Sequence, residues 1–332
     1  MTRVAVMGCG SWGTTFALVL ADAGAKVTMW GRRPEVCAEI TDRHRNTGYL
    51  ADVALPGTIV ATTDAGQALD GAEIVVLAVP SQTLRDTLGG WQQAVPRDAV
   101  LVSLLKGVEL GTLRRMSQVI AEVTGAAPER IAVVSGPNLA LEIARRQPTA
   151  TVVASCDPHT AEVVAQACSS PWFRPYTNAD VVGVELAGAV KNVIALAVGI
   201  AEGMGFGDNT KATLITRGLA ETSRLGLAMG ADPTTLAGLA GMGDLVATCA
   251  SPLSRNRSFG VELGRGRSMA EATAVARTAE GARSCGPILE LARRHGVDMP
   301  ITEQVVATVL HGHPLSELGS RLLGRPRKAE GG

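Results

Sequence analysis

The chain has 332 residues, of which 46 % are hydrophobic and 19 % charged, and its 31 basic and 31 acidic side chains leave no net charge. A chain of this length exceeds the size at which one hydrophobic core usually suffices, so two domains are expected. The balanced charge gives no support for a nucleic-acid partner. No uncharged apolar run approaches the roughly 20 residues that a membrane span needs.

The cysteines and the N-terminus both favour a cytoplasmic location. The six cysteines show no C-x-x-C pair and no regular spacing, which predicts reduced thiols that pack as small apolar side chains. The first residues enter a strand at once and carry no secretory signal pattern. His311 and His313 are the closest histidine pair, and because no third ligand is near them in the sequence, no metal site is expected.

The chain opens with a strand, a glycine turn and a helix. An apolar run at residues 4–7 leads into a G-x-G-x-x-G run at 8–13, followed by a helical pattern at 15–23 and a second strand at 26–30. Gly8 permits a sharp turn, Gly10 leaves room for a pyrophosphate, and Gly13 lets the helix pack closely on the strand. The glycine string by itself is also typical of a chance turn. Within this βαβ-sized unit it predicts a dinucleotide-phosphate site, because free N–H groups at a helix start attract an anion.

The end of the second strand bears on the choice of cofactor. NAD-selective sites carry an acidic residue there, which accepts hydrogen bonds from the adenosine ribose. This strand instead ends at Arg32 and Arg33, whose guanidinium groups favour the additional phosphate of NADP. Two alternatives stay open, because the arginines could cover a solvated loop and Glu35 could still reach a ribose. NADPH is therefore the expected cofactor, with NAD as the alternative.

The remaining chain divides into a strand-rich and a helix-rich part. Apolar strand-like runs recur at 73–79, 99–105, 130–135 and 151–155, which predicts an α/β fold with a Rossmann-type, doubly wound parallel sheet. From residue 184 onward, Ala/Leu/Gly-rich helical spacing predicts an all-helical domain. We expect an NAD(P)-binding domain at 1–183, a helical substrate-binding and catalytic domain at 184–323, and a disordered tail at 324–332.

Two lysines are candidates for chemistry. Lys191 interrupts an apolar helical segment at 185–195, where a lysine is costly to bury unless a cleft between the domains compensates it. There it could exchange a proton with a substrate oxygen, although a lysine on the wet face of the helix is the alternative. Lys106 ends a predicted strand. Ligands of open α/β sheets bind beyond the carboxyl ends of strands, so Lys106 is expected at the same crevice.

A donor-rich loop follows in the helical part. The segment at 251–257 combines Ser254, Arg255 and Asn256 with a proline, shortly after the glycine-rich stretch that contains Asp244. Hydroxyl, guanidinium and amide donors close together suit a phosphate. A charged surface loop is the alternative interpretation.

Together these residues resemble one family, the bacterial-type NAD(P)-dependent glycerol-3-phosphate dehydrogenases. The strings that carry the resemblance are GCGSWGT at 8–14, SLLKG at 103–107, SGPNLA at 135–140, VKNV at 190–193, GMGDLVATC at 241–249 and SPLSRNR at 251–257. The resemblance implies a Rossmann domain joined to a helical domain. It also implies the interconversion of dihydroxyacetone phosphate and sn-glycerol 3-phosphate, at the head of glycerophospholipid synthesis.

The resemblance also implies roles for individual residues. Lys191 would be the acid/base that delivers a proton to the C2 oxygen, with Lys106 and Asp244 assisting. The implied cofactor contacts are Gly8, Gly10, Ser11, Trp12, Gly13, Arg32, Arg33, Tyr49, Lys106, Ala140, Arg255, Thr278 and Glu280. The implied substrate contacts are Lys106, Gly136, Asn138, Lys191, Asp244, Ser254, Arg255 and Asn256. The chain departs from the family at Asn138 and Leu139, where Ser or Thr and then Phe are more usual, and at Thr278-Ala279, where Val-Val is.

Two other functions compete with this interpretation. A β-hydroxyacid or phosphogluconate-type dehydrogenase also joins a Rossmann domain to a helical domain with a catalytic lysine, but the 251–257 loop and the GMGDL string argue against it. A non-catalytic NAD(P)-sensing regulator is the second, and both lysines favour chemistry over it. The expected partner is the small-molecule substrate, with no nucleic acid and no membrane span. A homodimer is expected as the commonest state of soluble enzymes.

Overall fold

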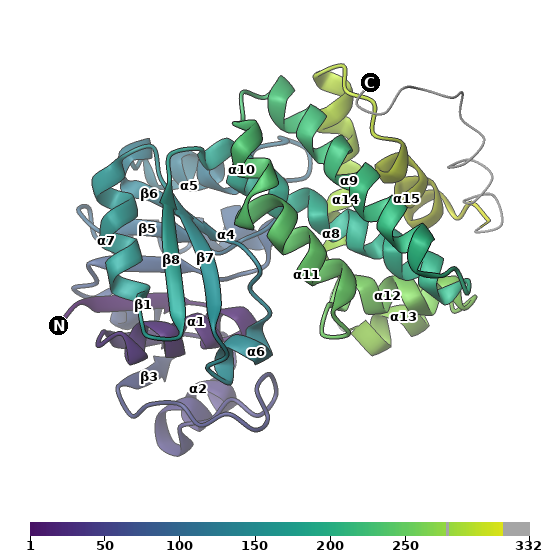
Figure 1. The fold of residues 1–332 in the computed structure, drawn as a ribbon. Helices are drawn as coiled ribbons and strands as arrows, with labels where there is room; N and C mark the ends of the chain where they lie inside the picture. Colours follow the sequence, from purple (N-terminus) through teal and green to yellow (C-terminus); the bar gives the residue numbers. More distant parts are fainter. Residues whose placement is uncertain (277–278, 315–332) are drawn as a thin grey trace.

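The computed structural model describes residues 1–276 and 279–314. It has two parts (Figure 1): the first half of the chain, purple to teal, forms a sheet with its covering helices, and the green to yellow helices gather beside it. The tail predicted at 324–332 lies outside the described residues.

The sheet is a parallel sheet with one reversal. Its strands are β1 Arg3–Met7, β2 Lys26–Trp30, β3 Ile59–Thr62, β4 Ile74–Leu77, β5 Val100–Ser103, β6 Ile131–Ser135, β7 Thr149–Ala154 and β8 Phe173–Asn178. In the described chain they form a sheet of order β3-β2-β1-β4-β5-β6-β7-β8. All neighbours pair in parallel except β6 and β7, which are antiparallel. The predicted α/β fold is confirmed. The reversal at β7 was not predicted, because an apolar run does not show which way a strand pairs with its neighbour; the connection before β7 carries a five-residue helix.

Two strands were missed because they lie at the edges of the sheet. β3 and β8 each have one neighbour, and most of their residues are partly or fully exposed. β8 also contains Pro175, which an edge strand tolerates. Such strands lack the continuous apolar run that identifies a strand buried on both faces. The central strands are buried on both faces, and their predicted bounds lie within two residues of those observed.

Helices cover both faces of the sheet. In the first part they are α1 Ser11–Asp22, α2 Pro34–Arg43, α3 Ala65–Leu69, α4 Leu84–Gly89, α5 Met116–Thr124, α6 Ala140–Ala144 and α7 Pro158–Cys168. One apolar cluster packs α1, α2 and α7 on one face, with Phe16 and Phe173 among its fully buried side chains. A second cluster packs α3, α4 and α5 on the other. The sheet is therefore doubly wound, with the carboxyl ends of β1, β4, β5 and β6 along one edge.

The second part is helical throughout its described residues. Its helices are α8 Val181–Gly203, α9 Asp208–Ala228, α10 Pro233–Ala237, α11 Asp244–Ala250, α12 Arg255–Gly264, α13 Met269–Ala276, α14 Glu280–Arg294 and α15 Pro300–His311, with a π-helical turn, η4, at Leu239–Gly243. α8 is the central element. By length and composition it could cross a membrane, but 89 % of its most apolar window is buried within the protein, as expected of a core helix. Because α8 begins at Val181, the predicted boundary at 183/184 falls inside its first turn, and the division into domains stays a prediction.

α8 and α12 pack backbone against backbone. A Cβ on Gly199 would lie 2.1 Å from the carbonyl oxygen of Arg257, and a Cβ on Gly260 would lie 2.2 Å from that of Leu196. These glycines let the two helices approach more closely than side chains would permit. The start of α12 is thereby held against the middle of α8, where Lys191 and Asn192 lie.

Among the contacts that join the helical part to the sheet, one is apolar and one is polar. An apolar cluster of Val133, Val152, Ala154, Val184 and Ala240 packs β6 and β7 against α8 and η4.

The other contact is polar and buried. Glu185 of α8 accepts hydrogen bonds from the Ser117 N–H at 2.7 Å and from its hydroxyl at 2.6 Å, and it pairs with Arg115. A carboxylate of α8 therefore caps the N-terminus of α5, and the loop between β5 and α5, which carries Lys106, is fixed to the helix that carries Lys191.

Candidate active site

The glycine loop, residues 8–13, connects β1 to α1 in a tightly packed turn. Gly8 has φ +141°, and a Cβ there would lie 2.5 Å from the carbonyl oxygen of Ala78. A Cβ on Gly13 would lie 2.2 Å from the carbonyl oxygen of Gly8. Both positions therefore require glycine. A Cβ on Gly10, in contrast, would meet nothing within 4 Å. The packing of the chain itself does not require a glycine there, whereas the approach of a ligand to the backbone would.

A buried asparagine, Asn46, which was not predicted from the sequence, holds the loop by hydrogen bonds. Asn46 is fully buried, and its Nδ2 donates to the carbonyl oxygen of Cys9 at 3.0 Å and to Thr14 Oγ1 at 2.8 Å. Trp12 is partly buried, and its Nε1 has no hydrogen-bond partner among the described residues. α1 begins at Ser11 with Gly10 as its N-cap, so the N–H groups of its first turn remain available to an anion.

The end of β2 presents exposed cations. Arg32 and Arg33 follow the strand directly and both are exposed. The Arg33 guanidinium lies 5.6 Å from the ring centroid of Tyr49 and 3.9 Å from Glu35. The structure therefore places Arg33 beside Tyr49, another residue expected at the adenosine end of the cofactor, while Glu35, the alternative ribose partner, lies next to Arg33.

The lysine–aspartate cluster consists of Lys106, Lys191, Asp244 and Thr248. Asp244, which is 1 % exposed, accepts from Lys106 Nζ at 2.5 Å with one oxygen and from Lys191 Nζ at 2.6 Å with the other. Lys191 Nζ also donates to Thr248 Oγ1 at 2.6 Å. Three elements contribute to this arrangement, because Lys106 follows β5, Lys191 lies on α8, and α11 supplies both Asp244 and Thr248.

The cluster holds an excess of positive charge in a buried place. Two ammonium groups share one carboxylate, so a second anion would be stabilised there. Burial lowers the pKa of Lys106 to about 8, with the charge of Lys191 adding to the effect and Asp244 opposing it. Thr248 was not singled out from the sequence. It stands four residues after Asp244, and that helical spacing places both on one face of α11.

The carboxyl end of β6 adjoins the cluster. The carbonyl oxygen of Gly136 accepts from Lys106 Nζ at 3.2 Å. A Cβ on Gly188 of α8 would lie 2.9 Å from Ser135 Oγ and 3.4 Å from Lys106 Cγ, so Gly188 makes room for the Lys106 stem. Asn138 donates from Nδ2 to Thr151 Oγ1 at 3.1 Å, and its buried Oδ1 has no partner within the described part of the chain.

The start of α12 is anchored to α8 by amides. Ser254 caps the helix by accepting from the Arg257 N–H at 3.3 Å. Asn256 is buried, and its Nδ2 donates to Asn192 Oδ1 at 2.9 Å while its Oδ1 accepts from the Gly281 N–H at 2.9 Å. One N–H of the Asn256 amide is left for a ligand.

Arg255 is exposed at the first position of α12. Its charge, with those of Lys106 and Lys191, acts on Glu280 at the start of α14. Burial nonetheless raises the pKa of Glu280. These residues therefore share one electrostatic environment.

The remaining predicted residues are placed as follows. Ala140 begins α6, and its carbonyl oxygen accepts from Thr15 Oγ1 of α1 at 3.2 Å. Thr278 lies outside the described residues. His311 and His313 have ring centroids 6.5 Å apart, and the described residues contain no group of three or more His, Cys, Asp or Glu side chains that could hold a metal.

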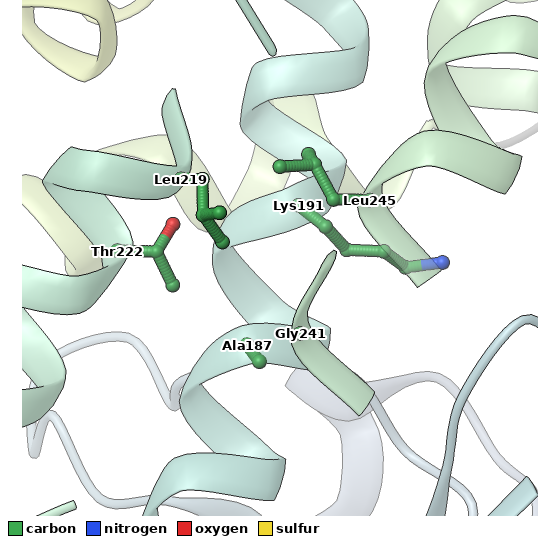
Figure 2. A pocket seen from close by; sticks show the side chains of 6 residues that line it. All are labelled: Ala187, Lys191, Leu219, Thr222, Gly241 and Leu245. Carbon is green, nitrogen blue, oxygen red and sulfur yellow. The ribbon is translucent and has the colours of Figure 1, made fainter. Parts of the chain in front are cut away.

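Figure 2 shows how Lys191 leaves its helix. A crevice is lined by its stem together with Ala187, Leu219, Thr222, Gly241 and Leu245. The stem runs beside Leu245, and the ammonium turns away from Leu219 and Thr222. The crevice therefore packs the stem, and the ammonium lies at the other end of the side chain, in the lysine–aspartate cluster.

A dinucleotide-type glycine loop and a buried cation pair at the carboxyl edge of one sheet define a class, the nicotinamide-dinucleotide-dependent dehydrogenases with a helical second domain. The chain belongs to the NAD-dependent glycerol-3-phosphate dehydrogenase family. The model of the N-terminal part of that family matches residues 3–161, and the model of its C-terminal part matches residues 180–320.

Individual relatives match over the whole chain. A glycerol-3-phosphate dehydrogenase [NAD(P)+] of Streptomyces griseus is 61 % identical, covering 99 % of this chain and 98 % of its own, and one of Thermobifida fusca is 59 % identical, covering 99 % of each. The crystal structure of glycerol-3-phosphate dehydrogenase from Coxiella burnetii is 37 % identical, with a TM-score of 0.93 over 98 % of this chain and 99 % of that one.

Proposed function

We propose that this protein catalyses the NAD(P)H-dependent interconversion of dihydroxyacetone phosphate and sn-glycerol 3-phosphate, and so supplies the glycerol backbone of phospholipids. The observation that carries the proposal is the pair of buried lysines on one carboxylate. An excess cation beside a proton donor suits a carbonyl oxygen that becomes an alkoxide during reduction.

The glycine loop and its surroundings fit a dinucleotide. The open space over Gly10 and the free N–H groups at the start of α1 suit the pyrophosphate, with Ser11, Trp12 and Ala140 beside it. Arg32, Arg33 and Tyr49 would hold the adenosine end. Two exposed guanidinium groups favour a 2′-phosphate, so NADPH is the preferred cofactor and NADH the poorer one. When bound, the nicotinamide supplies a hydride to the C2 carbonyl of the substrate.

The start of α12 is the proposed phosphate site. Arg255 supplies a charge, Ser254 and the free amide N–H of Asn256 supply donors, and the helix N-terminus adds its own N–H groups. Because Asn256 is hydrogen bonded to the neighbour of Lys191, a phosphate held here would position the rest of a three-carbon substrate against the lysine–aspartate cluster.

The proton comes from the cluster. Lys191 Nζ would donate to the C2 oxygen, and Lys106 Nζ would stabilise the developing charge on the same oxygen. Asp244 holds both ammonium groups in place, because its negative charge offsets their mutual repulsion. Gly136 and Asn138 would also contact the substrate. Glu280 would contact the cofactor, and Arg255 would contact the cofactor as well as the substrate phosphate. The domain division and the homodimer also remain predictions.

The direct test is to follow NADPH absorbance with dihydroxyacetone phosphate as the sole carbonyl compound. We expect turnover, and far poorer turnover of unphosphorylated dihydroxyacetone. A charge-assisted hydrogen bond contributes about 1.5 to 3 kcal/mol, so a phosphate with several such contacts changes the KM by more than about tenfold. Equal turnover of the two compounds would contradict the phosphate site, and cofactor binding without any turnover would favour the sensing function instead.

A further inference from the structure

Two thiols lie side by side beneath the glycine loop. A Cβ on Gly31 would lie 2.9 Å from Cys9 Sγ and 3.1 Å from Cys37 Sγ, so both sulfurs occupy the space that this glycine leaves free. The Cys37 thiol is close enough to help raise the pKa of Cys9, to which burial contributes most. Each also donates to a backbone carbonyl at the end of β2, Cys9 to Trp30 at 3.3 Å and Cys37 to Gly31 at 3.6 Å.

This thiol pair connects the two ends of the proposed cofactor site. Cys9 stands between Gly8 and Gly10 in the glycine loop. Cys37 lies on α2, one turn after Arg32 and Arg33. The family function does not need either thiol, since the loop makes its turn through glycines and its anion site through backbone N–H groups. The pair therefore has no part in the proposed chemistry.

The other cysteines are arranged differently. All six lie within the described residues, where Cys156 is exposed and Cys168, Cys249 and Cys285 are buried away from any second cysteine. Cys9 and Cys37 are thus a distinct buried pair, and Cys156 offers an exposed thiol for comparison.

We propose that Cys9 and Cys37 form a redox-modification site, which a peroxide converts to an intramolecular disulfide that weakens binding of the nicotinamide dinucleotide. The first part rests on the geometry of the two sulfurs alone. The second part rests on the proposed function, because it takes the glycine loop as the cofactor site.

The chemistry balances with one peroxide per pair. One thiolate attacks the peroxide, its sulfur becomes a sulfenic acid, the O–O bond breaks and a water leaves. The second thiolate then attacks that sulfur, the S–S bond forms, the S–O bond breaks and a second water leaves. The pair gives up two electrons and two protons. Burial raises the pKa of both thiols, so they are protonated at neutral pH and oxidise slowly.

Formation of the disulfide would pull on the loop, because the two sulfurs must move together into bonding contact. The loop has little room to follow, because Gly8 and Gly13 are already packed against backbone atoms and Asn46 holds the Cys9 carbonyl from the other side. Movement of Cys9 toward α2 would therefore turn the backbone N–H groups of the loop away from a pyrophosphate.

The test combines peptide mapping with cofactor binding. The full-length protein is treated with hydrogen peroxide, and the protein before and after treatment is titrated with NADPH by fluorescence. We expect a linked peptide pair containing Cys9 and Cys37, and a rise in the NADPH Kd of about tenfold or more, which corresponds to about 1.4 kcal/mol. Dithiothreitol should separate the linked peptides and return the NADPH Kd to its native value. Cys37→Ser should keep its NADPH affinity after peroxide, and Cys156→Ser should respond like the native protein.

Each part can fail separately. Absence of the linked peptides would overturn the modification site. Linked peptides with unchanged NADPH affinity would overturn the effect on binding, as would an equal loss of affinity in Cys37→Ser. If the untreated protein does not bind NADPH, the proposed function fails, and the peptide map still decides whether the disulfide forms.

Discussion

The glycine loop and the lysine–aspartate cluster are built by opposite means. The loop excludes side chains, since a Cβ on Gly8 or Gly13 would lie within 2.5 Å of a backbone oxygen. The cluster depends on side chains, with two ammonium groups held on one buried carboxylate. A site formed by close backbone packing is disrupted when a side chain is added at a packed position, such as Gly8 or Gly13. A site made of buried charge fails when one charge is removed, even if packing is preserved.

The largest effect is expected from adding one methyl group to the loop. Gly8→Ala should abolish measurable NADPH binding, because the residue has φ +141° and its Cβ would lie 2.5 Å from the Ala78 oxygen. Gly24→Ala is the control, since Gly24 has φ +95° but its Cβ would meet nothing within 4 Å. Titration by fluorescence compares the two. If Gly8→Ala binds NADPH as the control does, close packing is not what the loop requires.

Removing a charge at the start of α12 should have a smaller effect than this loss of binding. Arg255→Ala should raise the KM for dihydroxyacetone phosphate by about tenfold or more, the value of a lost charge-assisted hydrogen bond. Arg257→Ala is the matched control on the same helix, because Arg257 is paired with Glu202 at 2.6 Å. Steady-state kinetics distinguish them. A KM that rises equally in both variants would assign the effect to the helix and not to a phosphate contact.

A smaller effect is expected at the exposed end of β2. Arg32→Asp should lower the ratio of kcat/KM with NADPH to that with NADH by about tenfold, because the new carboxylate repels a 2′-phosphate and can accept from a ribose hydroxyl. Arg43→Asp makes the same charge change at the last turn of α2. Should the ratio stay at its native value, Arg32 faces solvent in the complex.

The glycine loop was predicted from the sequence more completely than the lysine–aspartate cluster. The glycine loop is a continuous local motif, so its strand, turn and helix were all predicted, although α1 begins at Ser11, four residues before the predicted helical pattern. The two lysines were also predicted, because Lys191 interrupts an apolar helical segment and Lys106 stands at the end of a strand. The sharing of one carboxylate was not, because Lys106 and Asp244 are 138 positions apart in the sequence. Asn46, Glu185 and Asn192 were missed for the same reason, since a supporting hydrogen bond between distant elements leaves no local pattern.

The smallest effect concerns a buried charge away from the cluster. Glu221 of α9 is 1 % exposed and accepts from the N–H groups of Ile301 and Thr302 at the start of α15. Burial raises its pKa to about 7, above the unfolded value of 4.5. The folded protein therefore binds this proton more tightly, so its contribution to stability is complete below pH 4.5 and is lost as the pH rises to about 7.

Glu221→Gln should flatten that part of the profile of Tm against pH. Glu290→Gln, on an exposed pair with Arg294, is the control and should leave the profile unchanged. A native profile that rises between pH 4.5 and 7 and is unaffected by Glu221→Gln would mean that this carboxylate is charged in the folded protein.

Proton donation by the lysine–aspartate cluster is measured most directly by single-turnover reduction of dihydroxyacetone phosphate with the Lys191→Met variant. Methionine keeps the length and apolar packing of the stem beside Leu245, so NADPH affinity should stay near the native value. The rate should fall by about 10² to 10⁴, the contribution of a positioned general acid. Lys106→Met should reduce the rate less, because Lys191 still donates. If Lys191→Met reduces the substrate within about tenfold of the native rate, Lys191 is not the proton donor and the account of the cluster is wrong.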